Sequence, residues 1–294
     1  MHRTIRTCLA IAALALTGAT APPPSMNDIL AHSPKSDWHL INPANTLVMS
    51  LPHGRVTIQL APAFAPNTVT NILKLVHAHY FDGSFIVRAQ DNYVVQWARN
   101  DKRPLGSANA TIPAEFDRWA TVEIPFHALP DPDTYARETG FSFDFPAARD
   151  APSRRIWLTH CYGMVGVGRD VPADSGNGTE LYAVIGQAPR HLDRNVTLVG
   201  RVIDGMELLS VMPRGTGPLG FYQKSEHKIP IAWIRLGSDL PPAERPRFEA
   251  LNTGSRTFAA LLAERRARPD PWFKHSPGRI NVCNVPLPVR RSVR

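Results

Sequence analysis

The stretch YFDGSFIVRAQDNYVVQWA, residues 80–98, decides the fold. Residues 84–88 and 93–97 are rich in β-branched and aromatic side chains, which predicts two short strands. Residues 90–92, Gln-Asp-Asn, lie between them and favour a turn, because such side chains hydrogen bond to the nearby backbone. The strand, turn and return strand would bring three side chains to one patch: Arg88, Tyr93 and Gln96.

Further strands and two helices flank this hairpin. Residues 55–60 alternate between apolar and polar side chains, which predicts a strand with one buried face. Pro66 suits the first position of a helix, and apolar residues follow it at helical spacing. A short helix is predicted over 206–212. The other strand candidates are residues 46–51, 163–169, 180–185, 197–203 and 229–236. About eight strands with a helix at each end predict a mainly β fold, a closed antiparallel barrel without exposed sheet edges.

Several sequence blocks occur in the order typical of a known family. A small turn and an aromatic residue precede the pattern R-x-x-x-x-aromatic-x-x-Q, which runs from Arg88 to Gln96. This pattern resembles the catalytic segment of the cyclophilin-type peptidyl-prolyl isomerases. Similar blocks are APNTVTNILKLV (65–76) upstream, and GMVGVGR (163–169), NGTELYAVIG (177–186) and HLDRNVTLVGRVIDGM (191–206) downstream. Together they cover most of residues 45–237, for which the resemblance implies an eight-stranded barrel capped by two helices.

The resemblance also implies an activity, the cis–trans isomerisation of peptide bonds to proline. Rotation about such a bond has a barrier of ~18–20 kcal/mol and is slow without a catalyst. A catalyst must bind the twisted amide better than either planar form, and this requires no nucleophile, metal or cofactor. We therefore expect no metal and no cofactor, and the expected partners are proline-containing peptides or proteins.

Roles for individual residues follow from the same resemblance. Arg88 matches the family's catalytic arginine, Gln96 matches the glutamine that orients it, and Tyr93 completes the catalytic set. The implied substrate-binding residues are Val94, Gly168, Arg169, Glu180, Tyr182, His191, Leu192 and Val196. Four of the matched residues would form an apolar socket for the proline ring: Tyr93, Val94, Tyr182 and Leu192.

Some of these residues depart from the family pattern. Tyr93 and Tyr182 replace phenylalanines and add hydroxyls that need hydrogen-bond partners. Glu180 stands where the family usually has glutamine. Its carboxylate would either pair with Arg88 and draw it off the substrate, or be neutralised by Arg169. The main alternative to an enzyme is therefore a module that binds proline-containing segments with weak or no catalysis.

Three segments lie outside the resemblance. Residues 22–44 predict a polar, proline-rich leader. Residues from about 118 to 155 delay the next family strand, and we interpret them as an insertion. A structureless loop of this length is unusual in a compact domain, which favours a packed flap or a functional segment. Residues 238–294 form a C-terminal extension, and the segment 248–268 within it is predicted to contain an amphipathic helix.

The first 21 residues have the layout of a secretory signal peptide. Arg3 and Arg6 precede an apolar run that ends in small residues and is too short to span a bilayer. Its removal would place the protein in the periplasm or outside the cell, with Cys161 and Cys283 as the remaining cysteines. In an oxidising compartment they would form a disulfide between the barrel and the C-terminal segment. The alternative is two separate buried thiols.

Adjacent His160 and Cys161 raise the question of a metal site or a cysteine nucleophile. Neighbouring residues of a strand point to opposite faces, and no CxxC or HExxH spacing is present. We therefore predict structural roles for both residues.

The charge pattern argues against a nucleic-acid partner. The chain has 33 Lys and Arg against 25 Asp and Glu, a formal net charge of +8, and loss of Arg3 and Arg6 would leave 8 − 2 = +6. The cations are scattered apart from two short clusters near the C-terminus, which indicates solvated surface positions. We expect a monomer that does not span a membrane.

Overall fold

The computed structural model describes residues 23–99, 101–187, 189–224, 226 and 228–292. The predicted signal peptide lies outside these residues. In the described part of the chain, nine strands form one antiparallel sheet in the order β14-β4-β5-β12-β11-β13-β3-β2-β15. They are β2 (Thr46–Leu51), β3 (Gly54–Leu60), β4 (Ser84–Ala89), β5 (Val94–Ala98), β11 (Met164–Val167), β12 (Leu181–Val184), β13 (Leu198–Asp204), β14 (Pro230–Ile231) and β15 (Trp233–Leu236).

The two ends of this sheet meet in one short segment. β14 pairs with β4 and β15 pairs with β2, while Ala232 alone separates β14 from β15. At this junction the Gly83 N–H donates to the Ile231 carbonyl (3.1 Å), and the Ala232 N–H donates to the Ser50 carbonyl (3.0 Å). The sheet is therefore a nearly closed barrel. The single strand predicted over 229–236 is divided at Ala232, so the barrel sheet of the described residues has nine strands where eight were predicted.

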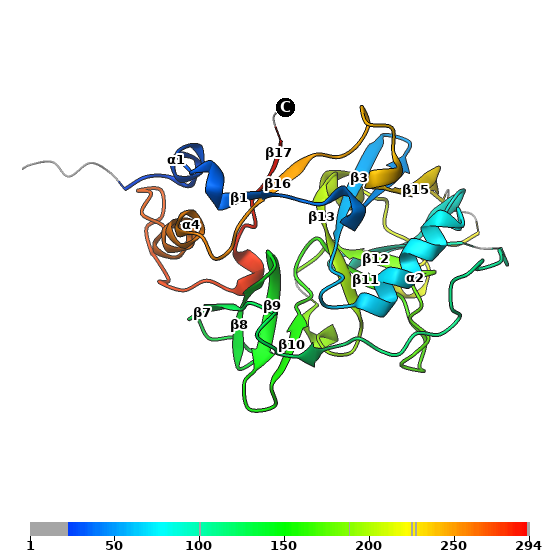
Figure 1. Ribbon diagram of the computed structural model, residues 1–294, viewed down its shortest axis with the longest axis horizontal. Coiled ribbons are helices and arrows are strands. Elements are labelled where there is room, and N and C mark those ends of the chain that lie inside the picture. Colours follow the sequence, from blue (N-terminus) through cyan, green and yellow to red (C-terminus); the bar gives the residue numbers. More distant parts are fainter. Residues whose placement is uncertain (1–22, 100, 188, 225, 227, 293–294) are drawn as a thin grey trace, which may run out of the picture.

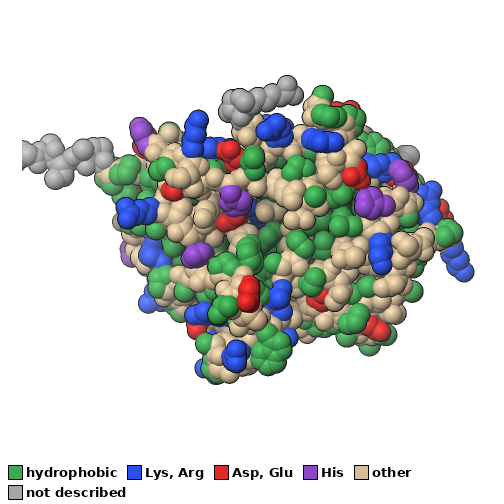
Figure 2. All heavy atoms as spheres, viewed as in Figure 1, with side chains coloured by type: hydrophobic (Ala, Val, Ile, Leu, Met, Phe, Trp, Pro, Cys, Tyr) green, Lys and Arg blue, Asp and Glu red, His purple; other side chains and the backbone are tan. Residues whose placement is uncertain are grey.

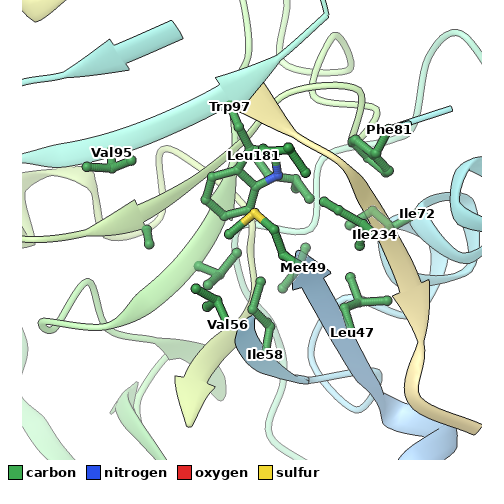
Figure 3. Close-up of a cluster of buried hydrophobic side chains, with 14 of the residues drawn as sticks. Leu47, Met49, Val56, Ile58, Ile72, Phe81, Val95, Trp97, Leu181 and Ile234 are labelled. Carbon is green, nitrogen blue, oxygen red and sulfur yellow. The ribbon is translucent and has the colours of Figure 1, made fainter. Parts of the chain in front are cut away.

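Two helices cap the barrel and contribute to its core. α2 (Pro66–His77) begins at the proline, as predicted, and its apolar face, including Ile72, is buried. α3 (Met206–Ser210) is slightly shorter than predicted. Figure 3 shows the fully buried side chains from several strands that meet in this core, among them Met49, Trp97 and Leu181. Because Trp97 faces the core, its neighbour Gln96 faces the other side of the sheet.

The predicted insertion folds as a second sheet rather than as a loop. Its strands are β6 (Arg118–Trp119), β7 (His127–Leu129), β8 (Glu138–Ser142), β9 (Phe145–Asp150) and β10 (Arg155–Leu158). They are antiparallel in the order β6-β10-β9-β8-β7. The β8–β9 hairpin turns at Phe143 and Asp144, both of which have positive φ. The sheet ends at Leu158, slightly beyond the predicted boundary at residue 155.

The two ends of the described chain meet in a third sheet. β1 (Trp38–Leu40) pairs with β16 (Phe248–Leu251), which pairs with β17 (Val289–Arg291). Helices α1 (Met26–Ala31) and α4 (Arg256–Ala267) lie beside each other (Figure 1). Residues 23–44, predicted as a polar leader, are therefore folded. α1 has six residues, too few to show helical periodicity in the sequence.

A second hydrophobic core joins these outer elements to the barrel. Phe141 of β8 and Phe258 of α4 meet edge to face, with ring centroids 5.0 Å apart. Met164 of β11 and Leu198 of β13 belong to the same buried cluster. Figure 1 shows the insertion strands β7–β10 below α4 and beside the barrel. The insertion and the extension therefore pack against each other and against the barrel strands that lead to the site.

A disulfide joins Cys161, which lies just before β11, to Cys283 in the 3-10 turn Val282–Asn284. The sequence left two alternatives for these cysteines, and the structure has the disulfide. It links the barrel to the C-terminal extension across a sequence separation of 122 residues.

A polar contact also ties the insertion to the third sheet. The Asp144 carboxylate lies 3.0 Å from His39 Nε2 and accepts a hydrogen bond from the Thr253 N–H at 2.9 Å. Burial alone would raise the pKa of Asp144, but the hydrogen bonds from His39 and Thr253 outweigh burial and lower the pKa below 3.8. The hydrogen bond to Asp144 raises the pKa of His39 above 6.5, although partial burial opposes the shift.

Asp144→Asn should lower the free energy of unfolding by about 1 kcal/mol, since His39 is half-exposed and water screens its ion pair. Because its pKa is lowered, Asp144 makes its full contribution to the free energy of unfolding above pH 3.8, and this contribution is lost as the pH falls. The raised pKa makes the contribution of His39 complete below pH 6.5, and it is lost as the pH rises through the raised value. In urea unfolding, the difference between wild type and variant should be largest between pH 3.8 and 6.5. A difference that does not change with pH would contradict this assignment.

The visible surface carries scattered charge. On the face shown in Figure 2, Lys and Arg side chains lie among acidic and apolar ones rather than in a block. In the described part of the chain, no helix has the length and apolar character needed to cross a membrane.

Candidate active site

The β4–β5 hairpin pairs Arg88 with Gln96, so these two residues of the predicted patch lie together. Ile86 pairs with Trp97, so Val87 is an extra residue in β4, a β-bulge. Residues two apart on a regular strand share a face, and Ile86 is fully buried in the barrel core. The bulge therefore turns Arg88 out of the core and onto the side of the sheet that Gln96 faces.

Neutral acceptors hold the Arg88 guanidinium. Its Nε donates to the Leu219 carbonyl at 2.7 Å, and its Nη2 donates to Gln90 Oε1. Its Nη1 lies 3.4 Å from Gln96 Oε1, a longer contact. Burial lowers the pKa of Arg88 from its usual value, yet a guanidinium remains charged at neutral pH. The result is a fixed, half-buried cation.

Two aromatic rings flank this cation. The centroids of Tyr93 and Phe221 lie 5.2 and 5.1 Å from Arg88 Cζ. Phe221 forms an antiparallel bridge with Arg88 and follows the 3-10 turn Pro218–Gly220, whose Leu219 has a left-handed backbone (φ 56°). This loop was not predicted from the sequence. Its residues predict only a Gly-Pro turn, and its partner Arg88 is 131 residues away in the sequence.

Glu180 has neither of the two partners expected for it. It accepts a hydrogen bond from Gln96 Nε2 at 2.7 Å. Arg169 donates to backbone carbonyls beside it, including that of Asn195 at 2.8 Å. Within the residues that the structure describes, neither arginine forms an ion pair with Glu180. The expected competition of Glu180 for Arg88 is therefore wrong, because Glu180 bonds instead to the glutamine beside Arg88.

A cavity of about 660 Å³ opens in front of Arg88 and Gln96. Gly168 allows the walls to approach, because a Cβ there would lie 3.0 Å from Glu180 Cβ. His191 is outside the lining and instead stacks on Tyr93, with ring centroids 6.2 Å apart. All other predicted site residues line the cavity, together with Val167, Asp170, Val171, Ser175, Thr179, Leu219 and Phe221.

The region that builds this cavity matches a known family model. Residues 46–232 match the model described as cyclophilin type peptidyl-prolyl cis-trans isomerase/CLD. The chain belongs to the cyclophilin family. The resemblance from which the site was predicted is thereby confirmed at the level of the family.

Individual relatives of this cyclophilin agree. It is 23% identical over 193 residues to proteins from Brucella suis and Brucella abortus, each described as a probable peptidyl-prolyl cis-trans isomerase, with 66% of this chain and 84% of each relative covered. A crystal structure of a cyclophilin from Hirschia baltica is similar over 92% of this chain and 99% of its own, with a TM-score of 0.70 and 22% identity. This likeness shows that the shared fold extends beyond the barrel.

In this cyclophilin Tyr182 has a buried partner for its hydroxyl. The hydroxyl lies 2.9 Å from His160 Nε2, and His160 Nδ1 lies 3.0 Å from Asp193. Burial lowers the pKa of His160 although Asp193 opposes the shift, so the neutral ring donates from Nδ1 and accepts from Tyr182 at Nε2. Burial raises the pKa of Tyr182, which keeps the phenol protonated. The Tyr182 hydroxyl therefore has a hydrogen-bond partner inside the protein. The structural role predicted for His160 is to accept this hydrogen bond.

Proposed function

We propose that this cyclophilin catalyses the cis–trans isomerisation of X-Pro bonds in exported proteins, with Arg88 as the catalytic cation. The observation that carries the proposal is a charged guanidinium held by neutral acceptors at the edge of a partly apolar cavity. An exported location is supported by the N-terminal sequence and by the disulfide between Cys161 and Cys283, since disulfides are typical of oxidising compartments.

The proposed mechanism is differential binding of the twisted amide. The proline ring would occupy the socket lined by Tyr93, Val94, Tyr182 and Leu192. As the amide twists, its nitrogen regains a lone pair, so a fixed cationic donor beside it binds more strongly in the transition state. A charge-assisted hydrogen bond contributes ~1.5–3 kcal/mol against a barrier of ~18–20 kcal/mol. Positioning and desolvation of the substrate would supply the remaining acceleration.

Proton NMR exchange spectroscopy on a short Ala-Pro peptide tests this function. Spontaneous isomerisation takes tens of seconds or longer, so cross-peaks between cis and trans signals at sub-second mixing times report catalysis alone. We expect such cross-peaks with the protein at about a hundredth of the peptide concentration, and none with buffer. Peptide shifts that follow protein concentration without any exchange would instead support a proline-binding module.

Glu180 should give the site a preference for cationic substrates, because its carboxylate is exposed at the cavity and lacks an ion-pair partner among the described residues. We expect kcat/KM to be up to about fivefold higher for a peptide with lysine near the proline than for one with glutamate. Added salt should reduce this ratio. In Glu180→Gln the ratio of kcat/KM for the lysine peptide to that for the glutamate peptide should fall, because only the other charges of the site then act on the substrate. A ratio unchanged by the substitution would contradict the assignment.

A further inference from the structure

A chain of buried polar contacts leads from the proline socket into the insertion. Asp193 accepts hydrogen bonds from the His160 backbone N–H (2.9 Å), from the His160 ring (3.0 Å) and from Arg190 Nε (2.5 Å). Arg190 also donates through both Nη atoms to Asp133, each at 2.9 Å. The side chains of Arg190 and Asp133 are each 3% exposed. Tyr182 is thus connected to the insertion without an intervening water-exposed group.

Asp133 is held firmly at the insertion end of this chain of contacts. Its Oδ1 accepts hydrogen bonds from the backbone N–H groups of Tyr135 (2.9 Å) and Ala136 (3.0 Å). The segment therefore fixes the carboxylate by local contacts, and the carboxylate presents a bidentate acceptor to Arg190. Such a planar fork constrains orientation as well as distance.

The turn that Asp133 anchors carries residues of the site. The 3-10 turn Arg190–Leu192 has Leu192 in the cavity lining and His191 stacked on Tyr93. Arg190 at the start of the turn pairs with Asp193 directly after it, which closes the turn on itself. Asp133 ties this closed turn to the insertion from outside, while Asp193 ties it to His160 on the barrel side. Displacement of the turn would move Leu192 directly, and Tyr182 through Asp193 and His160.

We propose that Asp133 is a positioning residue for the proline socket, through which the insertion holds the 190–193 turn in the geometry that substrate binding requires. This inference rests on the proposed function, because the socket is the same. It assigns the insertion a role in the activity of the barrel rather than in its stability alone.

The sequence offers a matched control two residues away. Asp131 is also a buried acceptor of the insertion, 7% exposed, but it binds Arg266 of α4 and the Ile280 N–H. Asp133→Asn and Asp131→Asn each remove one buried charge from an arginine and keep the size of the side chain. The first loosens the turn of the site, and the second loosens the extension.

Both variants should be assayed at 10 °C as full-length mature protein, after circular dichroism has shown that they are folded. We expect Asp133→Asn to lower kcat/KM by about tenfold to a hundredfold, since small displacements of positioning groups have effects of this size, and Asp131→Asn to change it less than about twofold. Equal kcat/KM values for the two folded variants would overturn the inference. If the wild type binds a proline peptide without catalysis, the proposed function fails. The inference is then tested by the peptide Kd of the two variants: a weaker Kd in Asp133→Asn than in Asp131→Asn supports it, and equal values overturn it.

A second pair of variants tests the inner link and serves if Asp133→Asn does not fold. His160→Leu leaves the buried Tyr182 hydroxyl without an acceptor, so kcat/KM should fall. Adding Tyr182→Phe removes the unpaired hydroxyl, and H160L/Y182F should recover most of the loss. If His160 does not act on the socket through the Tyr182 hydroxyl, the double variant should have no higher kcat/KM than H160L. That result would overturn the proposed connection between His160 and Tyr182.

Discussion

Arg88→Ala is expected to lower kcat/KM for X-Pro isomerisation by about a hundredfold or more, because removal of one fixed donor to the transition state has effects of this size. The guanidinium is fixed by the Leu219 carbonyl, Gln90 and Gln96, so its position needs little reorganisation during the reaction. The exchange assay on a short Ala-Pro peptide measures the change. Peptide affinity should fall much less than kcat/KM, since the lost interaction is strongest in the twisted state.

Two further variants separate the charge of Arg88 from its geometry. Arg88→Lys keeps a cation but cannot reach several acceptors with a planar fork, so we expect an activity between wild type and Arg88→Ala. Arg55→Ala removes an arginine that pairs with Glu244 on the surface and should leave kcat/KM unchanged. Wild-type activity in Arg88→Ala would show that another group stabilises the twisted amide.

Loss of the disulfide should produce the largest change in stability. In the chain-entropy model, a cross-link over a loop of about a hundred residues contributes ~4–5 kcal/mol, and Cys161 and Cys283 are separated by 122 residues. We expect the variant C161S/C283S to lower the free energy of unfolding by about this amount. Urea denaturation of the oxidised wild type and of the variant measures the difference.

The same experiment carries its own control. Reductant should lower the midpoint of the wild type and leave the variant unaffected, because the variant has no bond to reduce. Hydrogen exchange should increase first in α4 and β17, since the disulfide ties the extension that contains them to the barrel. An oxidised wild type and a variant with equal midpoints would show that hydrophobic contacts alone hold the extension.

The barrel and the core of the site were predictable because their signals are local or belong to a family pattern. The hairpin from Arg88 to Gln96 contains its own strands and turn, and the prediction that these two side chains share one patch follows from it. The bulge at Val87 was not predicted, because a strand of six residues is too short for a one-residue shift in its alternation to be recognised. The break at Ala232 was missed for a similar reason: two short strands on opposite edges have the sequence of one strand.

The remaining parts depend on partners that are distant in the sequence. Trp38 pairs with Leu251, and Arg88 binds a carbonyl 131 residues away, so neither contact leaves a local pattern. The insertion strands are two to six residues long, too short for reliable periodicity. The partner of Glu180 was mistaken because charge favours an arginine, whereas the fold places Gln96 within 2.7 Å.

The pairing of β1 has a consequence for the order in which the molecule is completed. β1 pairs only with β16 among the described strands, so its backbone has no partner until more than two hundred further residues have been synthesised. Contacts between residues so far apart in the sequence form late in folding. Until then an unpaired strand is prone to non-native pairing and aggregation. Truncation of the chain before residue 248 would remove β16 and leave β1 without its pairing partner. The exposed strand would then lie near the N-terminus, although the truncation is at the C-terminal end.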